Sequence, residues 1–274
     1  MKFGFVTCVQ LGLSCMEEIY RAGGVLDLAM SLPDDVATAK SGRVYLDAFC
    51  RERSIPLLKA PNVNDNAVVE AIRSHEIDWL FIIGWSQIAR EEVLAAPRQG
   101  VLGMHPTLLP VGRGRAAIPW AILKGLPETG VTLFQLDHGV DTGPILAQQR
   151  IPLAADETAT TLYTKVNAAH RALIRSVWPD LAAGTLRPQP QDDRQATVWP
   201  GRAPEDGAIS SSMTVAEVDR LVRAVTRPYP GAYVDDGGRR LRIWSGMPGR
   251  NSDGFPVPLA DGFYTAHDAE WERT

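Results

Sequence analysis

The chain has 274 residues, of which 45% are hydrophobic, 28 are basic and 32 are acidic, giving a net charge of −4. This length and apolar content suffice for one large folded domain, or for one domain with a small appendage. Charges of both signs are interspersed without long runs. The sequence therefore lacks the electrostatic footprint of a protein that binds DNA or an anionic membrane.

Three cysteines, Cys8, Cys15 and Cys50, have no metal-ligand spacing and leave one thiol unpaired in any disulfide scheme. We therefore expect a reduced, cytoplasmic protein with no bound metal. The N-terminal segment lacks the apolar region and cleavage pattern of a signal peptide, and no stretch is long enough to span a bilayer.

Apolar runs and amphipathic stretches alternate through the first two-thirds of the chain, which predicts an α/β fold with a mostly parallel sheet flanked by helices. Ser14 and Glu17 have the spacing of a capping box, and Gly184 would end the longest helix. The predicted strands are 2–6, 25–32, 55–58, 78–83, 100–105 and 130–136, and the predicted helices are 15–21, 43–53, 66–75, 117–124 and 158–183.

The remainder of the chain predicts a linker and a small second domain. Residues 187–206 are rich in proline and polar residues and show no clear hydrophobic period. Beyond them we expect a helix over 215–225 and two strands, 231–234 and 240–244. The Asp-Asp-Gly-Gly sequence between these strands is a hairpin signal. The expected division is a first domain over 1–186, a linker over 187–206 and a β-rich domain over 207–274.

His105 and Asp141 are the candidate catalytic pair, because each follows a predicted strand and strand ends are where open α/β sheets bind ligands. A histidine moves protons near neutral pH, and a neighbouring carboxylate can fix its charge and tautomer. A structural histidine and a turn aspartate are the alternative. The sequence lacks the motifs of dinucleotide oxidoreductases, P-loop NTPases, zinc hydrolases and serine hydrolases.

The other four histidines, at 75, 138, 170 and 267, are expected at helix ends, in turns or on the surface.

Several segments around this pair resemble the formyltransferase family that uses 10-formyltetrahydrofolate. The resemblance is carried by 105–110, 113–120, 129–133, 141–145 and 161–163, and it resumes at 202–207 and 222–232. The last two segments resemble the start of the C-terminal domain in the tRNA and amino-sugar enzymes. The resemblance implies a Rossmann-like formyltransferase fold followed by a small, β-rich, OB-like domain.

The family's catalytic set is Asn-x-His with a distant Asp. His105 and Asp141 match the last two members, but Gly103 stands at the Asn position. Thr132 matches a position that can steady the histidine ring, and an ordinary strand residue is the alternative for it.

The resemblance also assigns binding residues. It implies that the formyl donor is held by Ile83, Gly84, Trp85, Ser86, Leu136, His138, Gly139 and Val140. It implies that the acceptor is held by Pro106, Thr107, Arg113, Gly114 and Arg115. Trp85 as a core or lid aromatic, and the two arginines as solvated loop charges, are the alternatives.

The glycine at position 103 removes a side chain that in relatives donates a hydrogen bond to the oxyanion. Losing one such donor typically costs about 2.7–4 kcal/mol. Three explanations are open. Another donor fills the space, such as a backbone N–H, Gln87 or water; or the acceptor is more nucleophilic, such as a hydroxylamine; or the chain is a folate- or nucleotide-binding relative without turnover.

From these observations we expect an N-formyltransferase that moves a formyl group from 10-formyltetrahydrofolate to a small-molecule amine. An amino-sugar nucleotide is the favoured acceptor, and N-hydroxyornithine in siderophore assembly is the competitor. Methionyl-tRNA is less favoured, because the chain is acidic overall and shows no basic insertion. A homodimer is compatible with this prediction.

Overall fold

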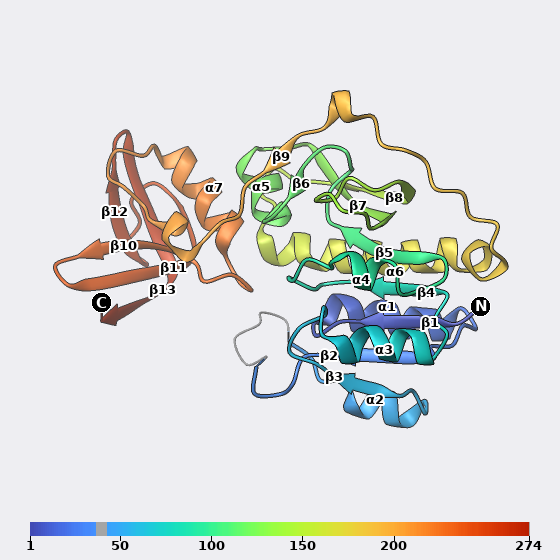
Figure 1. Cartoon of the computed structure of the whole chain (residues 1–274). Coiled ribbons are helices and arrows are strands. Elements are labelled where there is room, and N and C mark those ends of the chain that lie inside the picture. The colour runs from blue at the N-terminus through green and yellow to red at the C-terminus, as the bar shows by residue number, and fades with distance from the viewer. Residues whose placement is uncertain (37–42, 274) are drawn as a thin grey trace. The chain divides into compact units, whose positions relative to one another are not determined.

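The computed structural model describes residues 1–36 and 43–273 (Figure 1). Two compact units account for the chain, and each is considered by itself. The first unit comprises Met1–Arg113, Gly130–Ile151 and Val166–Val198, and the second comprises Gly114–Thr129, Pro152–Lys165 and Trp199–Thr274. The contiguous division into 1–186, 187–206 and 207–274 stays a prediction.

The first unit is built on a seven-stranded sheet with the order β3-β2-β1-β4-β5-β7-β8. Neighbours from β3 to β5 pair in parallel, and β5 pairs with β7 antiparallel. The mostly parallel, Rossmann-like sheet is therefore confirmed. Its strands are β1 (Phe3–Val6), β2 (Leu28–Ser31), β3 (Leu57–Lys59), β4 (Trp79–Ile82), β5 (Gly100–His105), β7 (Glu128–Gln135) and β8 (Ile145–Pro152).

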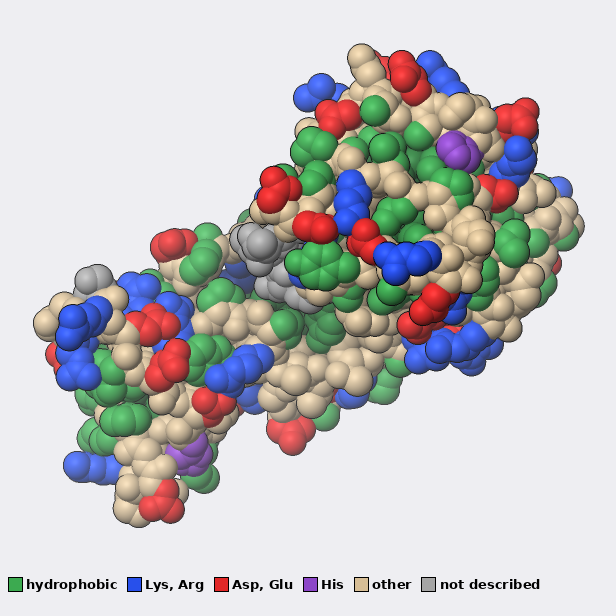
Figure 2. All heavy atoms as spheres, turned by 90° about the horizontal axis from the view of Figure 1, so that it is seen from below, with side chains coloured by type: hydrophobic (Ala, Val, Ile, Leu, Met, Phe, Trp, Pro, Cys, Tyr) green, Lys and Arg blue, Asp and Glu red, His purple; other side chains and the backbone are tan. Residues whose placement is uncertain are grey.

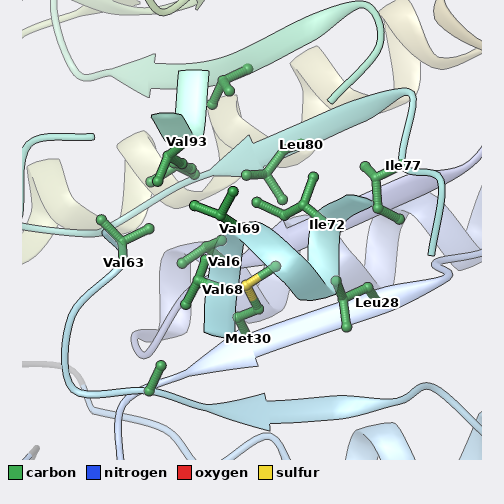
Figure 3. Packing of buried hydrophobic residues seen from close by; sticks show 13 residues of the cluster. Val6, Leu28, Met30, Val63, Val68, Val69, Ile72, Ile77, Leu80 and Val93 are labelled. Carbon is green, nitrogen blue, oxygen red and sulfur yellow. The ribbon is translucent and has the colours of Figure 1, made fainter. Parts of the chain in front are cut away.

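Helices accompany this sheet, and their apolar faces supply much of the core. They are α1 (Gln10–Arg21), α2 (Asp47–Glu52), α3 (Asn66–Ser74), α4 (Glu91–Leu94) and α6 (Ala159–Ala183). Helix α3 turns Val68, Val69 and Ile72 toward the strands, where they pack with Val6 and Leu80 (Figure 3). Burying a side chain of this size contributes about 1.5–3 kcal/mol, so this cluster anchors the strands whose ends carry the site.

Two predicted helix starts are wrong. Helix α1 begins at Gln10, and Ser14 is buried inside it, so Ser14 and Glu17 form no capping box. The N-cap residue is Val9, which makes no side-chain capping hydrogen bond, and its N–H donates to the Thr7 hydroxyl at 3.3 Å. The helix predicted from residue 43 begins only at Asp47, because residues 43 and 44 pair with the chain that follows β1.

The second unit contains α5 (Ala117–Leu123), α7 (Val215–Val225) and a four-stranded antiparallel sheet with the order β10-β11-β13-β12. Thr214 and Glu217 form the capping box of α7. Gly237 and Gly238 both have positive φ and form the two-residue turn of the predicted hairpin. The β-rich character of the C-terminal part is confirmed. The strands are β10 (Ala232–Asp236), β11 (Arg239–Pro248), β12 (Phe255–Leu259) and β13 (Gly262–Arg273).

Residues 187–206 carry short elements and not only loop. These are the 3₁₀ turns η1 (Asp193–Gln195) and η2 (Pro204–Gly207), and strand β9 (Val198–Trp199), which pairs with β6 (Arg113–Gly114).

Side chains of both charge signs are interspersed on the face shown in Figure 2, in keeping with the sequence. Within the described residues, none of the helices combines the length and apolarity that crossing a membrane requires.

Candidate functional site

His105 and Asp141 come together in the first unit. His105 is the last residue of β5 and lies opposite Thr132 of β7. Its Nε2 is 2.8 Å from the carbonyl oxygen of Gly112, and its Nδ1 is 3.5 Å from Oδ2 of Asp141. The two side chains are only 10% and 17% exposed, so solvent screens this pair weakly.

The contacts of His105 show which ring nitrogen carries a proton. A carbonyl oxygen only accepts, so Nε2 carries a proton and donates it to Gly112. Nδ1 faces a carboxylate, which also accepts when ionised. Nε2 therefore donates a hydrogen bond, and Nδ1 makes a longer contact of 3.5 Å that becomes an ion pair when the ring is protonated. Such a ring can stabilise negative charge and deliver a proton.

A polar network holds the Asp141 loop in place. Asp141 has φ 55°, a left-handed conformation that is costly for a non-glycine residue and persists where surrounding contacts impose it. Gln191 donates from Nε2 to the carbonyl oxygens of Asp141 and Gly143, at 2.8 and 2.7 Å. Asp137 accepts from the Gly139 N–H at 3.0 Å and from the Thr142 hydroxyl at 2.6 Å.

Arg113 extends this network beneath the loop. It is only 7% exposed, and its guanidinium donates to Oε1 of Gln191, at 3.1 Å from Nε and 2.8 Å from Nη2. Nη2 also contacts Asp193 at 2.7 Å. Arg113 therefore lies behind Gln191, which in turn fixes Asp141. Sequence analysis assigned Arg113 to the acceptor or to a solvated loop, and it missed Gln191, which lies in a polar stretch without a distinguishing pattern.

Thr132 holds the loop after His105. Its hydroxyl donates to the Thr107 carbonyl at 2.7 Å and accepts from the Leu109 N–H at 3.1 Å and from Gln148 Nε2 at 2.9 Å. One donor and two acceptor positions exhaust a hydroxyl. Thr132 thus acts on the backbone of 107–109 and not on the histidine ring. The Thr107 hydroxyl is buried and has no hydrogen-bond partner among residues 1–36 and 43–273.

The space beside Gly103 is occupied by leucine. A Cβ at Gly103 would lie 2.7 Å from Cδ2 of Leu136 and 3.4 Å from Cε1 of Phe134. Gln87, one suggested replacement donor, is engaged elsewhere, because its amide contacts the Val63 N–H and the Pro61 carbonyl at 2.8 Å each. The end of the Leu136 side chain therefore lies against the position that a Cβ at residue 103 would take.

The other residues assigned to the formyl donor fall into two groups. Ile83 is fully buried, and Gly84 has φ +66° with its missing Cβ only 2.2 Å from Val9, so this segment is tightly packed after β4. Trp85 packs against the core, and its Nε1 donates to Gln87 at 3.2 Å. By contrast, His138 and Val140 are exposed, and His138 Nδ1 lies 3.0 Å from Glu91 of α4.

Two acceptor residues belong to the second unit. Gly114 has φ +109°, and a Cβ there would lie 2.4 Å from the Trp199 carbonyl oxygen, so only glycine fits. Arg115 is exposed, and its backbone N–H donates to the same carbonyl at 3.1 Å. In the described part of the chain its guanidinium has no partner, which distinguishes it from Arg113.

His170 is a buried histidine, whereas sequence analysis expected it at a helix end, in a turn or on the surface. It lies on α6, is 1% exposed, and donates from Nδ1 to the Val166 carbonyl at 2.8 Å. Burial is the main cause that lowers the pKa of His170 to about 4; the hydrogen bond to Val166 opposes this shift, and nearby His105 adds a smaller lowering contribution. Its position four residues after Val166 and three before Leu173 could have indicated this burial.

Comparison with known proteins places this arrangement in a family. Residues 24–177 match formyl transferase, and residues 202–258 match the formyl transferase C-terminal domain. Methionyl-tRNA formyltransferase from Clostridium thermocellum is 20% identical, with 100% of each chain covered and a TM-score of 0.66.

Two further structures share the fold. An N-formyltransferase from Helicobacter canadensis, in complex with folinic acid and dTDP-3-aminofucose, is 18% identical over 98% of this chain and 100% of that one, with a TM-score of 0.74. HypX from Aquifex aeolicus, in complex with tetrahydrofolic acid, is 18% identical over 97% of this chain and 43% of HypX, with a TM-score of 0.69. Because the first family match alone spans more than half of the 274 residues, the chain belongs to the formyl transferase family.

Proposed function

We propose that this formyltransferase moves a formyl group from 10-formyltetrahydrofolate to a small-molecule amine, with His105 and Asp141 handling the proton. The observation that carries the proposal is the His105 ring, whose two nitrogens both face acceptors. The folate ligands of the Helicobacter canadensis enzyme and of HypX support a folate donor. An imidazolium beside a carboxylate suits a reaction that passes through an oxyanion.

The chemistry follows from that charge arrangement. The amine nitrogen bonds to the formyl carbon, and the carbonyl oxygen becomes an oxyanion that the His105 imidazolium stabilises. The bond to the folate nitrogen then breaks, and that nitrogen takes a proton from His105. The proton released by the attacking amine restores the ring, so the cycle balances. The Asp141 contact is the looser of the two, at 3.5 Å against 2.8 Å, so Nδ1 is the better placed nitrogen for the transfer.

The acceptor we favour is an amino-sugar nucleotide. The Helicobacter canadensis enzyme, similar over its whole length, was solved with dTDP-3-aminofucose. Arg115, whose guanidinium has no partner in the described chain, is a candidate contact for the anionic part of such an acceptor. Gly114 lets the backbone beside it approach closely.

A hydroxylamine acceptor is the second candidate, and Leu136 is the observation that favours it. Leu136 fills the space beside Gly103, so the oxyanion loses a donor worth about 2.7–4 kcal/mol on that side. A hydroxylamine such as N-hydroxyornithine is neutral at physiological pH and attacks without first losing a proton. It would therefore demand less help from the protein.

An acceptor panel tests the proposal. The full-length protein is incubated with 10-formyltetrahydrofolate and, separately, dTDP-3-aminofucose, N-hydroxyornithine and methionyl-tRNA. Tetrahydrofolate release and the mass of the product are followed together. We expect release that depends on the amino sugar, with a product heavier by one formyl group. Turnover with methionyl-tRNA alone would refute the small-molecule assignment, and absence of turnover with every acceptor would count against the function.

A further inference from the structure

The second unit contains a cavity that the formyl-transfer site does not use. Its volume is about 370 Å³, within the range of about 300–1,000 Å³ found for small-molecule sites. Its lining comes from α5, from the loop before β7, from the segment after β8 and from α7. The lining residues include Ile122, Gly125, Leu126, Pro127, Leu153, Arg220 and Arg223.

The walls of this cavity combine polar and apolar surface in about equal measure. Ile122 is buried on α5, and Leu126, Pro127 and Leu153 continue the apolar lining around it, together with three alanines. Sites for small organic ligands combine apolar side chains with a few polar groups that fix the orientation of the ligand.

Two of the three charged groups in the lining are already neutralised. Glu157 is 4% exposed and contacts Lys165 at 2.5 Å and the Thr161 hydroxyl at 2.6 Å. Arg223 pairs through Nε with Asp219 at 2.9 Å and donates through Nη1 to the Glu157 carbonyl at 2.9 Å. Nη2 of Arg223 makes no hydrogen bond to any described residue.

Arg220 is the exception. It is exposed, and its guanidinium has no hydrogen-bond or ion-pair partner in the described chain. It lies beside Gly125, where a Cβ would be 3.6 Å from Cζ of Arg220. The absence of a side chain at position 125 leaves the guanidinium room at the edge of the cavity. The cavity therefore presents one uncompensated positive charge next to an apolar surface.

We propose that this cavity binds a small organic anion that carries one acidic group on a mainly apolar body. The acidic group, a carboxylate or a phosphomonoester, pairs with Arg220 and lies within reach of Arg223, and the apolar body fills the space between Ile122 and Leu153. Planar bidentate pairing with an anion is the interaction to which a guanidinium is best suited. None of the lining residues belongs to the formyl-transfer site, so this is a second ligand site.

Binding to the full-length protein without folate tests the site. Isothermal titration calorimetry is performed with benzoate, phenyl phosphate and the uncharged benzyl alcohol. We expect saturable binding of at least one anion and binding at least about tenfold weaker for benzyl alcohol. Comparison of the two anions tells which acidic group the site prefers. Absence of saturable binding by either anion would overturn the proposal.

Three variants locate the binding. Arg220→Gln should weaken anion binding about tenfold. Arg73→Gln should leave it unchanged, because Arg73 is an exposed arginine of α3 whose side chain likewise has no partner in the described part of the chain. Ala154→Phe, at an exposed position in the lining, should fill the cavity and abolish binding without disturbing the core.

The same titrations separate this site from the catalytic one. Binding that survives Ala154→Phe, or that falls equally in the two arginine variants, would refute the site. Loss of binding in His105→Ala would place the anion at the formyl-transfer site instead. Since no formyl donor is present, the result is independent of whether the proposed function holds.

Discussion

The two sides of His105 are built in opposite ways. On the Asp141 side, Arg113, Gln191 and Asp141 form a continuous polar network whose hydrogen bonds are all 3.1 Å or shorter. On the Gly103 side there is no side chain, and Leu136 fills the space. The contrast indicates that hydrogen bonds hold the Asp141 side of the ring in place, whereas the Gly103 side offers the oxyanion no side-chain donor. Substitutions on each side of His105 can test this difference.

Converting the apolar side into a polar one should give the largest gain in rate. Gly103→Asn combined with Leu136→Ala supplies an amide and the room for it, and kcat should rise by up to about 100- to 1,000-fold. Gly103→Asn alone places the new Cβ 2.7 Å from Leu136 and should gain much less. Steady-state kinetics of wild type, both single variants and the double variant measure this difference. A fall in kcat in the double variant would show that another donor already serves the oxyanion.

Breaking the polar side should have the next largest effect. Arg113→Met removes the group behind Gln191 and lets the Asp141 loop shift, and a misplacement of this kind can cost about 100-fold in kcat. KM for the acceptor should change little, because Arg113 faces Gln191 and Asp193. Arg115→Met is the matched control, and there KM should rise instead. A rise in KM alone for Arg113→Met would place Arg113 at the acceptor.

A separate polar cluster around Glu18 should affect stability and not rate. Glu18 of α1 is 2% exposed and contacts Arg175 at 2.7 Å and Arg171 at 3.2 Å, both on α6. The Arg175 hydrogen bond is the largest cause that lowers the pKa of Glu18, to about 2. Glu18→Gln should therefore reduce the free energy of unfolding by about 1.5–3 kcal/mol at neutral pH, with kcat unchanged.

The pH dependence follows from the same pKa. Because the pKa of folded Glu18 lies below its ordinary value of 4.5, its stabilisation is fully present above that value and is lost as the pH falls toward about 2. Urea denaturation of wild type and Glu18→Gln at neutral and acidic pH measures the difference. Equal stability at pH 7 would contradict a stabilising cluster.

His170 should give the smallest effect. Its pKa in the folded state is about 4 and its ordinary value is 6.5, so between these values the unfolded chain binds more protons. The free energy of unfolding should thus fall with decreasing pH in this window, by at most about 1.4 kcal/mol per pH unit from this residue. His170→Gln should flatten that slope in urea denaturation, and an unchanged slope would show that His170 is not a buried neutral group. His267→Gln, at an exposed histidine, is the control.

The sequence predicted the parts of the fold that have strong local patterns. Strand β5 and helix α7 match their predicted limits, and the Gly237-Gly238 turn is where the hairpin signal indicated. Strand β12 was missed because Pro256 and Pro258 conceal it, yet proline is tolerated in an edge strand such as this one.

The catalytic residues of the site were predictable from the sequence, but the residues that hold them in place were less so. His105 and Asp141 could be found because they follow strands and match a family motif. Gln191 could not, because its role depends on a distant polar segment that folds back to the Asp141 loop. The filling of the Gly103 space by Leu136 depends on which residue lies beside β5 once β7 has paired with it. A single sequence does not specify that relation.

The central claim is that His105 handles the proton in formyl transfer. Its most direct test is the single-turnover rate of tetrahydrofolate formation with His105→Ala, measured beside His267→Ala and wild type with the acceptor that the panel identifies. General acid–base catalysis by one residue contributes about 100- to 10,000-fold, so the rate for His105→Ala should fall by that factor, while His267→Ala keeps the wild-type rate. A wild-type rate in folded His105→Ala would contradict the account.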